Sequence, residues 1–139
     1  MGRIEDKLNE IEEFIEELYE IFPDNLKAYL KSKEKKAACE RYFEKIIEAV
    51  TDVVFYVIKL KNLTIPQDEE SAFDILETNE VISKELCKNL KKAKGMRNII
   101  IHQYGIIDDK LVFNSISEEL KKDVKEFIKI IRQQIKSKK

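Results

Sequence analysis

The chain has 139 residues, of which 43% are hydrophobic and 38% are charged, and its formal net charge is −1. This composition is typical of a globular domain with a highly charged surface, and the scarcity of Gly (3) and Pro (2) favours long helices over a many-stranded sheet. With one histidine and no metal-binding spacing around Cys39 and Cys87, a zinc site is not expected, and both cysteines are predicted to be buried free thiols.

Apolar residues recur every three or four positions from residue 3 to residue 21, which predicts an amphipathic helix that ends at Pro23. A short helical piece is expected around Leu26–Leu30. Residues 33–61 form the longest periodic segment, and their apolar positions cover more than one face. We therefore predict a central helix that is contacted by several neighbours.

Pro66 lies in a segment that breaks this central helix, and a short helix is expected from about Glu69 to Glu77. Ser83 is a plausible N-cap of the next helix, and Gly105 is well placed as the left-handed residue after its end. Residues 115–118 match a capping box and predict the start of the last helix. The prediction is an all-α bundle of four main helices with short connecting helices.

Charges are distributed in blocks along the sequence. Residues 62–82 contain six acids and no base, whereas residues 83–97 contain six bases and one acid. A basic block of this kind can attract a polyanion such as RNA even in a nearly neutral protein. On charge alone, however, a solvated helix face is the preferred interpretation of its lysines, which are Lys84, Lys88, Lys91, Lys92 and Lys94.

The segment most suggestive of chemistry is Arg97-Asn98-Ile99-Ile100-Ile101-His102-Gln103-Tyr104. Cleavage of RNA needs a base that takes the proton of the 2′-hydroxyl group and a cation that stabilises the charged phosphorus centre. A histidine titrates near neutral pH and can act as base or acid, and a guanidinium can bind two phosphate oxygens at once. Arg97 and His102 could therefore cleave RNA without a metal.

Two features of this pair leave the interpretation open. On an ideal helix, residues five apart point roughly 140° away from each other, so Arg97 and His102 converge only if the helix loosens or two subunits meet. A purely structural alternative pairs Arg97 with an internal acid such as Glu48 or Asp52, and makes His102 a satisfied core histidine. The residues alone favour this alternative.

An R-x4-H segment at the end of a late helix resembles the signature of HEPN domains, and Asn98 fits the polar residue that follows the arginine. The ending His102-Gln103-Tyr104 is similar to the H-x-Y ending of HepT toxins. Residues 41–49, together with Asp52, resemble the long helix of that family, and residues 65–76 resemble its middle segment. The resemblance therefore spans most of the chain.

The resemblance implies one HEPN-type domain over residues 1–139. It also implies a homodimeric, metal-independent endoribonuclease, the toxin of a type VII-like toxin–antitoxin module, whose two active sites face each other across the dimer interface. Arg97 and His102 would be catalytic, with Asn98, Glu48 and Asp52 in support.

The implied partner is a minimal nucleotidyltransferase antitoxin that transfers AMP from ATP to the motif tyrosine, here Tyr104. The toxin itself would use no cofactor and would be cytoplasmic. The alternative from a different class is a non-catalytic subunit that presents a nucleotide or substrate to a nucleotidyltransferase. Intact Arg97 and His102 favour the nuclease, and a plain structural bundle would not explain the motif.

Overall fold

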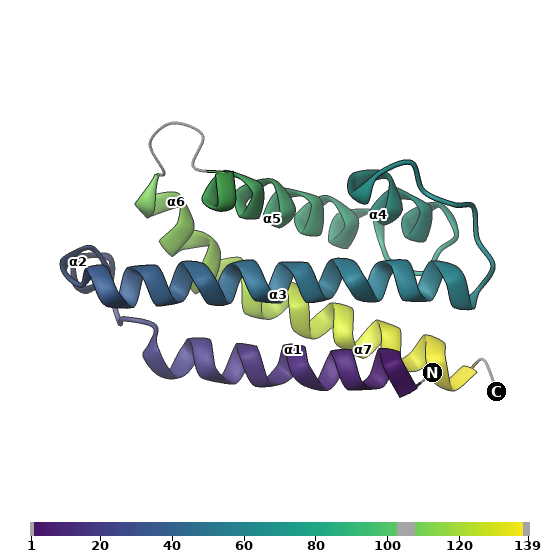
Figure 1. The fold of residues 1–139 in the computed structure, drawn as a ribbon, viewed down its shortest axis with the longest axis horizontal. Coiled ribbons are helices and arrows are strands. Elements are labelled where there is room, and N and C mark those ends of the chain that lie inside the picture. Colours follow the sequence, from purple (N-terminus) through teal and green to yellow (C-terminus); the bar gives the residue numbers. More distant parts are fainter. Residues whose placement is uncertain (1, 103–107, 138–139) are drawn as a thin grey trace.

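The computed structural model describes residues 2–102 and 108–137, and within these ranges every regular element is a helix. Figure 1 shows the long helices side by side, with shorter ones at the turns. The elements are α1 (Gly2–Ile21), α2 (Leu26–Lys31), α3 (Lys33–Leu60), α4 (Glu69–Thr78), α5 (Lys84–His102), α6 (Asp109–Asn114), the π-helical segment η1 (Ser115–Leu120) and α7 (Lys121–Ser137). The all-α prediction and the four main helices, α1, α3, α5 and α7, are confirmed.

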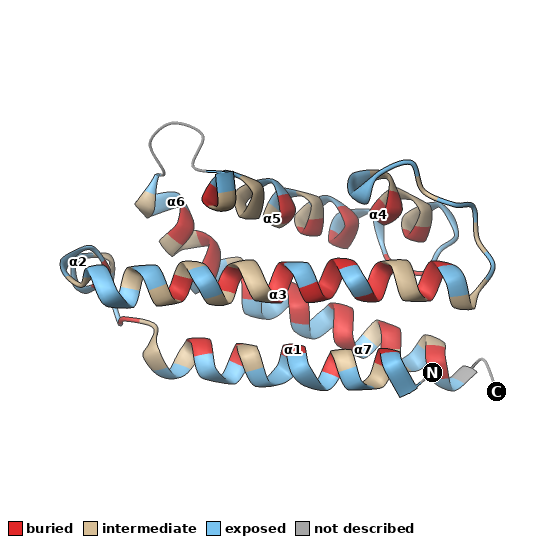
Figure 2. Cartoon of the chain, in the orientation of Figure 1, coloured by how far each residue is buried: buried red, intermediate tan, exposed pale blue. Residues whose placement is uncertain are grey.

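Helix α3 is the centre of the bundle, as its broad apolar surface predicted. It packs along α1 on one side and against α4 and α5 on the other, and α2 contacts its beginning. Helix α7 crosses behind it and reaches α1 and α5 (Figure 1). The buried residues of α3 consequently lie on several of its sides (Figure 2), and they include Phe43, Ile46, Val50 and Val54.

The helix ends follow local backbone chemistry. Helix α3 ends in a left-handed residue, Asn62, with φ of 54°, and the N–H of Leu63 reaches back to the carbonyl of Ile58 at 3.0 Å. This is the Schellman arrangement, in which asparagine is favoured after glycine. At the start of α5, the backbone N–H of Leu86 donates to Ser83 Oγ at 3.0 Å. The predicted N-cap of α5 is therefore confirmed.

The predicted start of the last helix at residues 115–118 is wrong. Ser115 has helical backbone angles and is buried, so it lies inside a helix that begins earlier, at Asp109. Asp108 is the true cap, because its side chain accepts the backbone N–H groups of Lys110 and Leu111 at 3.1 and 3.2 Å. The serine-rich segment instead forms the π-helical turn η1, a local widening of one continuous helix.

The core is continuous across the bundle and contains both cysteines, Cys39 and Cys87, as buried free thiols. Burial raises the pKa of each thiol to about 11, which keeps it protonated at neutral pH. None of the helices in the described part of the chain is both long and apolar enough to cross a membrane.

Candidate active site

Arg97 lies on the side of α5 that faces α3 and α4, and its side chain is 18% exposed. Its guanidinium NH2 group lies 3.6 Å from Glu48 Oε1 on α3, and NH1 lies 3.8 Å from Glu69 Oε1 on α4. NH1 also donates to Asn98 Oδ1 at 3.1 Å. Glu48 and Asn98, two of the predicted supporting residues, are therefore next to the arginine, and both carboxylates lie beyond hydrogen-bond distance.

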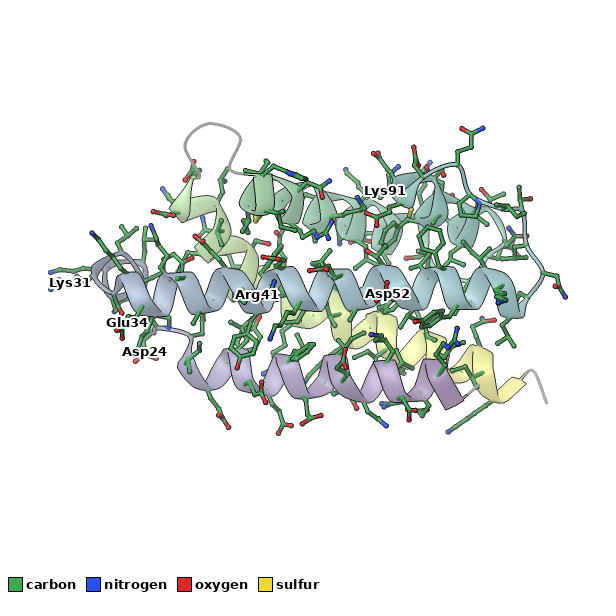
Figure 3. All side chains as sticks on the ribbon, viewed as in Figure 1. Asp24, Lys31, Glu34, Arg41, Asp52 and Lys91 are labelled. Atoms are coloured by element: carbon green, nitrogen blue, oxygen red, sulfur yellow. The ribbon has the colours of Figure 1, made fainter. Side chains whose placement is uncertain are left out.

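Asp52, the third predicted supporting residue, lies elsewhere. Its carboxylate Oδ2 is 3.6 Å from Lys7 Nζ on α1, one helical turn further along α3 than Glu48. Figure 3 labels Asp52 on α3. Glu48 and Asp52 are four residues apart and share an exposed face of α3, from which Glu48 reaches toward α5 and Asp52 toward α1. Asp52 thus forms an exposed ion pair between α3 and α1.

His102 is exposed and is the last residue of α5. The alternative of a satisfied core histidine is therefore wrong, although the other half of that alternative, an ion pair between Arg97 and Glu48, is present. Helix α5 is α-helical from Lys84 to His102, so no loosening of the helix before His102 redirects its side chain. Tyr104, the predicted modification site, and Gly105 lie outside the described residues.

The three isoleucines between Arg97 and His102 differ in burial. Ile100 faces the core, whereas the side of α5 that carries Ile99 points outward, and Ile99 remains 44% exposed. A single exposed apolar residue is ordinary on a protein surface, so Ile99 by itself does not mark a contact surface.

Lys94 is a functional candidate, although the charge pattern predicted it to be a solvated lysine. Its side chain is only 11% exposed, and its Nζ lies 2.9 Å from Glu69 Oε1. Glu69 was assigned only to a helix start. The sequence did contain one indication of a role for Lys94: it precedes Arg97 by three residues and therefore shares its face of α5.

Two other lysines of α5, Lys91 and Lys92, are also less available to RNA than the charge block suggested. Lys91 pairs with Asp74 at 2.9 Å and Lys92 pairs with Glu119 at 3.3 Å. Helix α4 (Glu69–Thr78) contains four of the six acids in the block of residues 62–82, and it packs directly against α5. Lys91, Lys94 and Arg97 pair with acids of α4, and this pairing weakens the case for α5 as an RNA-guiding surface.

A second group of chemically active side chains lies where α4 meets α5. One ligand atom from each of Asp74, Glu77 and Cys87 falls within 4.8 Å of the others, a spacing compatible with a metal ion. Lys91, labelled in Figure 3, places its ammonium group against Asp74. The Lys91 ammonium already balances the negative charge of Asp74, and the Cys87 thiol remains protonated. We therefore interpret this group as a polar contact between α4 and α5.

Comparison with known proteins bears on this fold and site. The family model "Ribonuclease HepT-like" matches residues 6–131. An mRNA nuclease HepT of Shewanella oneidensis is 32% identical over 89 residues, which is 64% of this chain and 66%, just under two thirds, of that protein. A tRNA nuclease HepT of Aphanizomenon flos-aquae is 31% identical over 115 residues, or 82% of this chain and 78% of that protein.

Solved structures agree with the sequence matches. The tri-AMPylated HEPN toxin of Shewanella oneidensis, solved in complex with an MNT antitoxin, superimposes with a TM-score of 0.88 at 25% identity, covering 94% of this chain and 96% of that one. A cytosolic protein of unknown function from Bacillus subtilis has the same fold, with a TM-score of 0.82 at 21% identity, covering 98% and 90%.

The all-helical bundle, which superimposes on a HEPN toxin, places the chain among HEPN-type proteins. Within that class, the chain belongs to the HepT-like ribonuclease family, whose model spans nearly its whole length.

Proposed function

We propose that this protein is a metal-independent endoribonuclease, the toxin of a type VII-like toxin–antitoxin pair, and that Arg97 and His102 cleave its RNA substrate. The observation that supports this most directly is the setting of Arg97. Its guanidinium is largely removed from water, yet Glu48 and Glu69 lie 3.6 and 3.8 Å away, too far for hydrogen bonds. An RNA phosphate, which accepts shorter charge-assisted hydrogen bonds, can therefore compete for this guanidinium.

In the proposed reaction, His102 takes the proton of a ribose 2′-hydroxyl, and the 2′-oxygen attacks the adjacent phosphorus. A bond forms between the 2′-oxygen and phosphorus as the bond to the 5′-oxygen breaks, and the leaving 5′-oxygen takes up a proton. Arg97 stabilises the negative charge that builds up on the phosphate oxygens. The names of two relatives, an mRNA nuclease and a tRNA nuclease, support RNA as the substrate.

We also propose that the active form is a homodimer. Because α5 stays α-helical up to His102, side chains at positions 97 and 102 point about 140° apart on ideal geometry. A two-fold contact would bring the motif of a second copy toward the first, so that groups from both copies act on one phosphate. The exposed Ile99 provides an apolar contact for such an interface.

The proposed partner is a minimal nucleotidyltransferase antitoxin that consumes ATP and attaches AMP to Tyr104, while this chain needs no cofactor of its own. The solved relative is an AMPylated toxin in complex with an MNT antitoxin, which supports this proposal by analogy. An AMP group close to Arg97 and His102 would place a negative phosphate where the RNA phosphate binds. Both proteins would then act in the cytoplasm.

The test is cleavage of single-stranded RNA by the purified protein in the presence of EDTA. We expect Arg97→Ala and His102→Ala each to lower the rate by about 10²–10⁴-fold, the usual loss on removal of an acid–base or charge-stabilising group. Arg41→Ala is the matched control, because Arg41 is an exposed arginine on α3 that pairs with Glu44 of the same helix. Variants at positions 97 and 102 that cut as fast as wild type would contradict the assignment.

A further inference from the structure

Glu69, in the first turn of α4, lies between two cations of α5. A single carboxylate oxygen, Oε1, is 2.9 Å from Lys94 Nζ and 3.8 Å from a guanidinium nitrogen of Arg97. Lys94 and Arg97 come from adjacent turns of one helix face, so the carboxylate connects them across the contact between α4 and α5. Among the described residues, Glu69 therefore links the two cations through its ion pairs with both.

The position of Glu69 is fixed from both sides. The preceding residue, Asp68, caps α4 by accepting the backbone N–H of Ser71 at 2.7 Å, while Ser71 Oγ accepts the backbone N–H of Asp68 at 3.1 Å. This capping box holds the first turn of α4 in place. On the other side, Lys94 is almost fully buried, and such a lysine needs a paired carboxylate to offset its desolvation.

Glu69 lies closer to Lys94 than to Arg97, and this difference determines how it acts on the guanidinium. Lys94 holds Glu69 closely, so the carboxylate stays at a fixed place near the guanidinium without forming a hydrogen bond to it. Arg97 is attracted toward both Glu48 and Glu69, and its buried Nε has no hydrogen-bond partner among the described residues. The two carboxylates therefore attract the guanidinium by charge without hydrogen-bonding to it, and NH1 donates to Asn98 Oδ1, so the NH2 group is left for a substrate.

We propose that Glu69, anchored by Lys94, is a positioning residue for Arg97; this inference rests on the ribonuclease function proposed above. Glu69 sets the direction of the guanidinium through their mutual attraction, while the Lys94 ammonium keeps the carboxylate from closing onto Arg97. The unit consists of Lys94, Glu69 and Arg97, and the RNA phosphate binds to the arginine that the other two orient.

The decisive variant is Glu69→Gln, which keeps the shape of the side chain and removes its charge. We expect the single-turnover rate of RNA cleavage to fall by about 10- to 100-fold, since misplacing a catalytic group by about 1 Å can cost this much. Binding of a 2′-O-methyl RNA, which cannot be cleaved, should be unchanged or tighter, because removing a negative charge favours a polyanion. If Glu69 positions Arg97, the Glu69→Gln variant therefore cleaves RNA more slowly while it still binds RNA. If Glu69 acts only through its negative charge, the variant binds RNA at least as tightly and cleaves it no more slowly.

Two further variants separate positioning from general damage. Glu70→Gln is the matched control, because Glu70 lies in the same helical turn, is more exposed and pairs weakly with Lys91 at 3.8 Å; it should cleave as wild type. Lys94→Gln should slow cleavage, and the double variant with Glu69→Gln should be little slower than the slower single variant, because the two residues act as one unit. Additive losses in the double variant would overturn the proposal.

A measurement that does not depend on RNA cleavage separates the positioning role of Glu69 from the proposed ribonuclease function. The side-chain Nε–H signals of Arg3, Arg41, Arg97 and Arg132 can be resolved in a ¹H–¹⁵N spectrum, and the Arg97 signal can be assigned by its loss in Arg97→Lys. We expect Glu69→Gln to shift or broaden the Arg97 signal and Glu70→Gln to leave it unchanged. An unmoved Arg97 signal, or cleavage by Glu69→Gln at the wild-type rate, would overturn the positioning role. A shifted signal in a protein that cuts no RNA would contradict the ribonuclease alone.

Discussion

Arg97 and His102 are five positions apart on one helix, and the structure gives them different surroundings. The arginine is enclosed by α3 and α4 and lies near two carboxylates, whereas the histidine is exposed at the helix end. A guanidinium keeps its charge in such an enclosed place, and a histidine that exchanges protons with substrate and water needs access to solvent. The difference in exposure therefore matches the two proposed roles.

The residue-scale prediction concerns Tyr104. After incubation with ATP and the cognate nucleotidyltransferase, we expect mass spectrometry to find AMP on Tyr104 and RNA cleavage to be lost. The attached phosphate would repel the RNA phosphate and could pair with Arg97. Tyr104→Phe, which lacks the hydroxyl group, is the control and should remain active under the same treatment. AMP found only on other residues, or a silenced Tyr104→Phe protein, would exclude this site.

At the scale of elements, α7 is attached to α1 by a cluster around Arg132. Its guanidinium donates to Glu5 at 2.9 Å, to Asn9 at 2.8 Å and to both oxygens of Glu12 at 2.8 and 2.9 Å. The three acceptors follow one another along a single face of α1, and a forked guanidinium is suited to bind them together. The cluster therefore fixes the crossing of two helices that are far apart in sequence.

We predict that Arg132→Ala lowers the unfolding free energy by about 1 kcal/mol at pH 7, a modest value because the groups are partly exposed. For a chain of this length, the melting temperature should fall by roughly 3–5 °C. Arg41→Ala, which removes an ion pair within a single helix, should change it less. Equal melting temperatures for wild type and Arg132→Ala would show that the cluster contributes nothing to stability.

The same substitution should show a defined pH dependence. The hydrogen bond from Arg132 lowers the pKa of Glu12 below its ordinary value of 4.5. A carboxyl group whose folded pKa is lowered stabilises the protein above its unfolded pKa, and this contribution is lost as the pH falls through the folded pKa. The difference between wild type and Arg132→Ala should therefore be full at pH 7 and shrink below about pH 4.5 in melts at several pH values.

At the scale of the whole molecule, the proposed dimer should depend on the exposed side of α5. We predict that Ile99→Asp converts a dimer to a monomer at micromolar concentration in light scattering, because a two-fold contact would bury two carboxylates near each other. Ile65→Asp is the control, since Ile65 is 87% exposed and lies between α3 and α4. A wild-type monomer, or a dimer that survives Ile99→Asp, would contradict an interface at this side of α5.

Much of this protein follows from the sequence by itself. Apolar spacing depends on neighbours three and four residues apart, so the positions of α1, α3 and α5 and the central place of α3 could be predicted. The Ser83 cap is a similarly local signal. The capping-box pattern at residues 115–118 was misleading, because Asp108 provides a competing cap and the intervening residues continue as helix.

Only the tertiary structure decided which groups meet across helices. It placed Glu48 and Glu69 beside Arg97, assigned Asp52 to Lys7, and buried Lys94 within a block of lysines that looked uniformly solvated. The rotation of each helix about its axis and the angle at which packed helices cross determine these contacts. Small differences in either one give a side chain a different partner on the neighbouring helix. The sequence thus determined the helices and the motif, whereas packing determined the electrostatic surroundings of Arg97.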